Sequence, residues 1–174
     1  MGEPVDFARL RLGEDGGEYA LDGSASCRAA AAALAAQARR GLALWTRDLD
    51  PALYDQVPFL EAVRRLVLEH RHARVRAIVY DARAVMQRGH RLVELARQLP
   101  SYVELRTPPL EDYAEYPEAF LVADGRGLLR RPFADRWEAT VSFDAPVAAR
   151  ELLRFFDEAW EVSRPDPELR RLHL

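Results

Sequence analysis

The fold is decided by residues 116–125, which read Tyr116-Pro117-Glu118-Ala119-Phe120-Leu121-Val122-Ala123-Asp124-Gly125. The apolar run over 119–123 predicts a buried strand. Turn residues occupy 124–127 and a second strand is expected over 128–131, so together they predict a β-hairpin. A further strand is expected over 137–143. Asp144 and Pro146 then open a final helix, whose predicted buried stripe consists of Leu152, Phe156, Ala159 and Trp160.

Upstream of this hairpin, strand and helix patterns alternate. The spacing of apolar residues predicts strands over 41–46, 74–80 and 102–106 and helices over 57–71 and 92–99, with residues 81–89 irregular. An alanine-rich helix is predicted over 25–39, capped by Ser24 or Ser26. Alternation of this kind is typical of parallel sheets. We therefore predict an α/β fold with a mixed, largely parallel sheet that is flanked by helices on both faces.

The length of 174 residues favours a single domain over residues 1–174. Alternating side chains over 5–11 and 17–21 predict an N-terminal hairpin inside an extension of residues 1–23. The main core is expected over 24–162. Residues 163–174 show no core-forming period, so we predict a tail there.

The charge balance restricts the classes of partner. The net charge is −3, which argues against a general nucleic-acid coat or a polybasic membrane tether. The chain contains one cysteine, no apolar run of about 18 residues and no leading apolar segment, so we expect a cytoplasmic protein without a membrane anchor. All 25 Lys and Arg residues are arginine and asparagine is absent, a composition typical of a GC-rich bacterial genome.

The order of the expected elements resembles one half of the phospholipase D-like fold over residues 24–162. The local matches lie in strands, loops and helices that follow one another in the family's order, and they are Trp45–Pro51 with Phe59–Val63, Ala73–Asp81, Phe120–Gly125 and Leu152–Trp160. The resemblance implies a half-unit of this fold. Single-unit members pair their sites across a two-fold axis, which implies a homodimer.

The catalytic motif of that family is degenerate in this chain. Active members carry His-x-Lys and then, after four intervening residues, Asp, and these positions read Pro117, Ala119 and Asp124. In the family the histidine attacks a phosphodiester phosphorus, the lysine neutralises the phosphate oxygens and the aspartate orients a histidine. A trailing Gly-Ser-x-Asn falls on residues 131–134, which read Arg-Pro-Phe-Ala. The resemblance therefore implies the fold without phosphodiesterase activity.

The leading hypothesis is a noncatalytic binding or regulatory module that forms a homodimer through the face around Tyr116, Pro117 and Ala119. One alternative is a metal-assisted hydrolase that uses loop carboxylates around Asp48 and Glu118. Another is an accessory subunit of a GNAT-type acetyltransferase, because the resemblance extends to a group of single phospholipase D-like modules that occur beside such acetyltransferase domains. No cofactor is expected, and the ligand stays open.

A weak phosphate or nucleic-acid binder is the remaining alternative, because guanidinium groups bind phosphate well. Its candidate anion-binding residues lie beside the family's active-site mouth and are Arg47, Arg106, Arg130 and Arg131. The competing interpretation is that these arginines are surface charges paired with some of the 28 acidic residues.

Other chemically active side chains have structural interpretations too. Histidines 70 and 72, with Arg71 and Arg74, fit a solvated helix end, and no metal-binding spacing involves them. Cys27 near a helix start could have a lowered thiol pKa, but an inert small side chain is the preferred interpretation. The tryptophans are expected in the core or in an interface rather than as stacking platforms. The loop acids are expected to be solvated, and they are Asp48, Asp50, Glu111, Asp112, Glu115 and Glu118.

Overall fold

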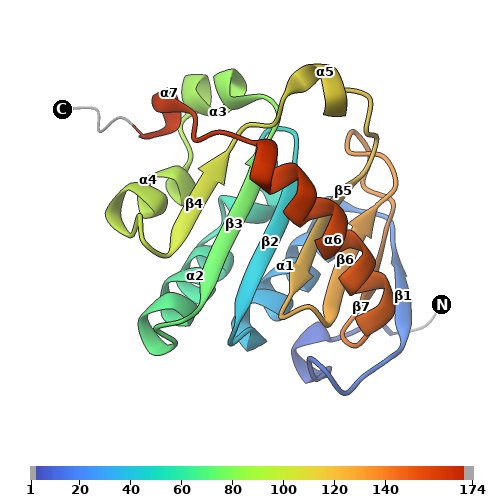
Figure 1. Cartoon of the computed structure of the whole chain (residues 1–174). Helices are drawn as coiled ribbons and strands as arrows, with labels where there is room; N and C mark the ends of the chain where they lie inside the picture. The colour runs from blue at the N-terminus through green and yellow to red at the C-terminus, as the bar shows by residue number, and fades with distance from the viewer. Residues whose placement is uncertain (1–2, 171–174) are drawn as a thin grey trace.

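One seven-stranded sheet organises the computed structural model, which describes residues 3–170 (Figure 1). The strand order is β1-β7-β6-β5-β2-β3-β4. The strands are β1 (Glu18–Leu21), β2 (Gly41–Thr46), β3 (Arg74–Val79), β4 (Val103–Arg106), β5 (Ala119–Ala123), β6 (Gly127–Arg131) and β7 (Ala139–Ser142).

The predicted mixed α/β class is confirmed, and the parallel part of the sheet is confined to β2, β3 and β4. The other pairings, β2 with β5, β5 with β6, β6 with β7 and β7 with β1, are antiparallel. The parallel share is therefore smaller than expected. Long connections that contain helices join the three parallel strands, as parallel pairing requires, whereas the turn 124–126 joins β5 to β6 and is short enough only for an antiparallel pair.

Helices cover the two faces of the sheet unequally. On one face α1 (Ser24–Gln37), α2 (Val57–Glu69) and α4 (Arg91–Gln98) pack on the larger apolar core. On the other face α6 (Pro146–Val162) crosses the sheet and carries the predicted buried stripe (Figure 1). Short elements complete the chain: η1 (Phe7–Arg9), η2 (Asp50–Tyr54), α3 (Ala82–Arg88), α5 (Leu110–Tyr113) and α7 (Pro167–Arg170).

Two predictions near the N-terminus are wrong. Residues 5–11 contain the 3-10 helix η1 instead of a strand, because Asp6 accepts a hydrogen bond from the Ala8 amide and Phe7 is buried. β1 therefore has no hairpin partner before it and pairs with β7. Helix α1 begins after Gly23 without a side-chain cap, and the Ser26 hydroxyl donates to the Gly23 carbonyl instead.

Two further segments are more ordered than expected. The stretch 81–89 holds helix α3, in which the Asp81 carboxylate accepts from the Ala84 amide. In the tail, Arg164 bridges to Thr107 and Leu169 of α7 is buried against the main core. Residues 163–170 therefore contribute a helix and a core residue, although the sequence shows no core-forming period there. Within residues 3–170 no helix has the length and apolar content needed to cross a membrane.

Candidate functional site

The C-terminal ends of the parallel strands meet the start of β5 and the end of β6 at one edge of the sheet. Thr46 is the last residue of β2, Ala119 is the first of β5, and Arg131 is the last of β6. Ala119 lies directly opposite Arg131 in the antiparallel register. Side chains alternate between the faces of a strand, and these three share the parity of Leu44, Leu121 and Leu129 in the larger core. All three therefore point to the face covered by α1 and α2.

The loop that follows β2 has an unusual backbone at this edge. Leu49 and Asp50 have φ values of 59° and 25°, which non-glycine residues rarely adopt. They lead into η2, a π-helix, and such segments often accompany functional sites. The Nε2 atom of His90 lies 3.0 Å from the Leu49 carbonyl oxygen and holds the turn in place.

His90 is locked in its neutral form. Its Nδ1 accepts a hydrogen bond from the Leu92 amide at 3.1 Å, so the ring proton resides on Nε2 and is donated to Leu49. Burial lowers the pKa of His90 below its usual value, against the raising effect of the Leu49 carbonyl. His90 therefore acts as a structural contact between α4 and the strained turn.

The strained turn places the Asp50 carboxylate against the Arg131 guanidinium. Arg131 Nη2 donates to Asp50 Oδ2 at 2.8 Å, and the Thr46 hydroxyl donates to the same oxygen at 2.9 Å. The Arg131 and Asp50 side chains are only 4% and 12% exposed. Arg131 also lies over the Trp137 ring, 4.8 Å from its centroid. We call Thr46, Asp50 and Arg131 the buried polar triad.

Burial dominates the electrostatics around this triad. It raises the pKa of Asp50, while the Arg131 charge and the hydrogen bonds from Thr46 and Arg131 oppose the increase. Burial also raises the pKa of the Cys27 thiol to about 11, and the thiol donates to the Trp137 carbonyl oxygen at 3.4 Å. Cys27 is therefore a neutral thiol at neutral pH, as the preferred interpretation of the sequence expected.

The three positions of the expected catalytic motif do not lie together. Pro117 is exposed in the loop before β5, whereas Ala119 is buried beside the triad. Asp124 follows β5 and therefore lies at the opposite end of that strand. Its carboxylate accepts hydrogen bonds from the amides of Arg39, Arg40 and Gly41 at 2.7–3.2 Å. Asp124 thus ties the turn between α1 and β2 to the β5–β6 hairpin.

The four candidate anion-binding arginines lie apart as well. Arg130 points to the α6 face and forms two 2.8 Å hydrogen bonds with Glu118, whereas Arg131 points to the opposite face. Arg106 pairs with Glu104 at 3.1 Å and lies 4.2 Å from the centroid of the Trp160 ring. Arg47 is exposed after β2. These residues therefore do not form one anion site, and three of them have acidic partners.

The loop acids likewise do not gather at one site, and several of them pair with separate arginines. Asp48 pairs with Arg88 at 3.1 Å, while Asp50 and Glu118 pair with their own arginines. Across the described residues, no group of three histidine, cysteine or acidic side chains is arranged to hold a metal ion. The remaining acids, Glu111, Asp112 and Glu115, are exposed in or after α5, as expected for solvated acids.

Two of the histidines and two of the tryptophans lie where the sequence predicted them. His70 and His72 follow α2, as expected for a helix end, and His173 lies outside the described residues. Trp45 is fully buried at the centre of an aromatic cluster beneath α6, and Trp160 is buried in the same core. The triad itself was not predicted from the sequence. The acidic loop 48–50 was noticed, but no local pattern connects it with Arg131, which lies 81 residues away.

Comparisons with known proteins agree with this fold. A family model described as "Domain of unknown function (DUF7931)" matches residues 23–172. Comparison of the sequence with curated proteins gives no match. The archaeal chromatin protein TrmBL2 superposes with a TM-score of 0.61 at 12% identity, and the match covers 86% of this chain and 54% of that one.

Two further solved structures match over nearly their full length, and one of them is described as a phospholipase D family member. The phospholipase D family member Nuc from Salmonella typhimurium matches with a TM-score of 0.61 at 14% identity, covering 86% of this chain and 97% of that one. NucT from Helicobacter pylori matches with a TM-score of 0.57 at 9% identity, covering 86% and 99%. The expected phospholipase D-like fold is therefore confirmed, and at these identities the likeness concerns the fold alone.

Proposed function

This chain belongs to the DUF7931 family, and we propose that it is a noncatalytic binding module built on the phospholipase D-like fold. The observation that carries the proposal is the buried polar triad. Ala119 takes the place of the catalytic lysine in the degenerate motif, and the nearest cation across the strand pair is Arg131. That cation is already neutralised by Asp50 and sealed from solvent.

A phosphodiester substrate would need both a nucleophile and an available positive charge at this edge. Pro117 and Ala119 offer neither. Freeing Arg131 would leave Asp50 as a buried, unpaired carboxylate, which is strongly destabilising. The strand ends that carry the catalytic residues in active phospholipase D-like proteins are thus occupied in this chain by the Asp50–Arg131 ion pair, which has no net charge. A binding role is compatible with the fold, because the matched TrmBL2 is a chromatin protein that binds DNA.

The first expected result is the absence of phosphodiesterase activity. Purified protein should hydrolyse bis(p-nitrophenyl) phosphate and single-stranded DNA no faster than a buffer control, because the motif positions carry no imidazole or amine. Hydrolysis should be followed by p-nitrophenolate absorbance and by gel electrophoresis. Activity that co-purifies with the chain over two columns and scales with its concentration would contradict the proposal.

The surface next to the closed edge supports a homodimer. Pro117 and Phe133 are both exposed, Phe133 by 50%, and the Ala134 amide donates to the Pro117 carbonyl oxygen at 2.8 Å, so the two loops lie together. Tyr116 stacks on Phe155 beside them. The adjoining Arg130–Glu118 pair is neutral. The Arg136 guanidinium lies over the Phe133 ring, 4.9 Å from its centroid, so the surface combines apolar and charged groups. Protein interfaces combine such groups, and in a two-fold contact each patch meets its own copy.

Ala119 belongs to the expected dimer face but is not a suitable site for testing the dimer. Ala119 is only 3% exposed within one chain, so a glutamate there would disturb β5 whether or not a partner is present. Phe133 is the better site. We expect a dimer by light scattering at micromolar concentration and a monomer for Phe133→Glu, because the two-fold axis places the charge in the contact twice.

Val147→Glu provides the matched control for this test. Val147 is 71% exposed in the first turn of α6, near the other end of β6. This variant should remain dimeric. A monomeric wild type, or a Phe133→Glu variant that stays dimeric, would exclude this surface as the interface.

A further inference from the structure

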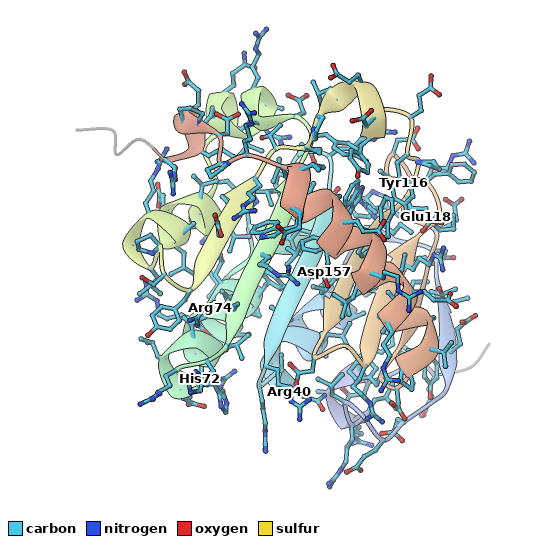
Figure 2. The ribbon with its side chains drawn as sticks, in the orientation of Figure 1. Arg40, His72, Arg74, Tyr116, Glu118 and Asp157 are labelled. Atoms are coloured by element: carbon cyan, nitrogen blue, oxygen red, sulfur yellow. The ribbon has the colours of Figure 1, made fainter. Side chains whose placement is uncertain are left out.

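A second chemically distinctive surface lies at the opposite edge of the sheet. It is a cavity of about 810 Å³ between the C-terminal ends of α1 and α2, the N-terminal segment 11–14 and the β5–β6 turn. Figure 2 shows Arg40 at the lower end of the molecule, far from Tyr116 and Glu118 at the upper right. We call this cavity the arginine groove. Its lining includes Arg11, Arg39, Arg40, Arg65 and Arg126.

Hydrogen bonds fix the walls of the groove. Asp124 binds the backbone amides of Arg39 and Arg40, so these residues are anchored through their main chain while their side chains stay exposed. Gln37 accepts from the Leu12 amide at 2.9 Å and donates to the Leu10 carbonyl at 2.7 Å, which holds the segment that carries Arg11. The groove is therefore preorganised, and ligand binding would not need to order its backbone.

The groove concentrates positive charge in a chain whose net charge is negative. Within residues 3–170, none of Arg11, Arg39, Arg40 and Arg65 has a carboxylate within 4.0 Å of its guanidinium. The lining also contains three acids, Glu14, Glu69 and Asp124, against the five arginines, and the Asp124 carboxylate binds backbone amides. Cations often follow helix C-termini, which explains single arginines there. Here two helices end side by side and turn their arginines toward one cavity.

We propose that the arginine groove binds a small ligand that carries two or more phosphate groups. Guanidinium groups bind phosphate through paired hydrogen bonds, and several of them around one cavity match a chain of phosphates. The volume falls within the range of about 300–1,000 Å³ that is usual for small-molecule sites. Phenylalanine, tyrosine and tryptophan are absent from its lining residues, and the one ring that could stack on a base is that of His70. The arginines outnumber this ring, so recognition should depend mainly on the phosphates.

Isothermal titration with inorganic tripolyphosphate and with ATP tests this assignment. Both should bind with affinities within about tenfold of each other, because the arginines contact the phosphates and only His70 offers a ring to the base. Arg40→Ala and Arg65→Ala should each weaken binding about tenfold, the factor that corresponds to the loss of one charge-assisted hydrogen bond. Arg64→Ala is the matched control. It removes the same charge from the same helix, but Arg64 bonds to Gln98 outside the groove.

Several outcomes would overturn the proposal. One is the absence of binding to either probe, and another is an equal loss of affinity in Arg65→Ala and Arg64→Ala, which would indicate attraction to overall charge. A 12-nucleotide single-stranded DNA that binds more than tenfold tighter than tripolyphosphate would assign the surface to nucleic acid instead. Circular dichroism of each variant verifies folding. The groove and the proposed dimer surface occupy opposite edges, so either can fail without the other.

Discussion

Arg131→Met is expected to lower the free energy of unfolding by about 3–5 kcal/mol, because it leaves a buried carboxylate without its counter-charge. The Asp50 side chain is 12% exposed and accepts its shortest side-chain hydrogen bond from Arg131. A whole domain is stable by only about 5–15 kcal/mol, so this loss brings the fold close to its limit. Urea unfolding followed by tryptophan fluorescence measures it.

Arg130→Met is the matched control for this loss. Arg130 is the preceding residue of the same strand and also pairs with a carboxylate, but its side chain is 39% exposed on the other face. Its loss should cost no more than about 1 kcal/mol, the usual range for exposed ion pairs. Equal effects of the two substitutions would mean that the Asp50–Arg131 pair is not sealed from water.

A double variant and a pH series distinguish the two possible causes of the stability loss in Arg131→Met, which are an unpaired charge and altered packing. Asp50→Asn keeps a residue that tolerates positive φ, and combined with Arg131→Met it removes both charges, so it should recover most of the lost stability. In Arg131→Met alone the folded-state pKa of Asp50 should rise further above its unfolded value. Folding then favours the protonated carboxyl, so the deficit should shrink as the pH falls from about 8 to about 5. A pH-independent deficit would attribute the loss to packing.

The second large effect is expected from the last long helix. Phe156 is fully buried and stacks on Trp160 at 5.6 Å between ring centroids, as the predicted stripe requires. Phe156→Ala should cost about 3–5 kcal/mol, because truncation of a buried aromatic leaves a cavity. For a chain of this length, such a loss lowers the melting temperature by about 6–20 °C. Thermal unfolding by circular dichroism measures the shift.

Trp160→Ala should also lower the stability of the fold, and it removes contacts with charged groups in addition to apolar burial. Guanidinium groups lie over its ring from two strands, Arg76 at 5.5 Å and Arg106 at 4.2 Å from the centroid, so truncation removes cation–π contacts as well as apolar burial. Val162→Ala, at a 53% exposed position of the same helix, should change stability by no more than about 0.5 kcal/mol. A Phe156→Ala variant that melts within about 2 °C of wild type would place α6 outside the core.

The sequence predicted the elements that local periodicity defines. The apolar spacing of residues 146–162 marked helix α6 and its buried face, and the alternation of strands and helices over 41–106 indicated three parallel strands. These predictions succeeded because a stripe of apolar side chains identifies the buried face of an element wherever that element packs. The turn residues 124–127 identified the β5–β6 hairpin for the same local reason.

Which segments pair or pack with one another was decided only by the tertiary structure. β1 had a correct strand pattern, but its partner is β7, more than 100 residues later, instead of the preceding segment. Phe7 packs on Tyr19 and Phe143 and favours a 3-10 turn where alternation suggested a strand. In the tail, Leu169 is buried although its segment has no apolar period, because one side chain can fill a core position without a repeating pattern.

The chemistry of the candidate site depends still more on long-range contacts. The sequence predicted, from residue identity alone, that Pro117 and Ala119 replace the motif's nucleophile and cation. It could not show that Arg131 is neutralised by Asp50, nor that Asp124 binds the amides of a turn more than 80 residues away. The charge that a side chain offers to a ligand is set by its burial and its nearest partners, and both arise only when distant segments of the chain pack together.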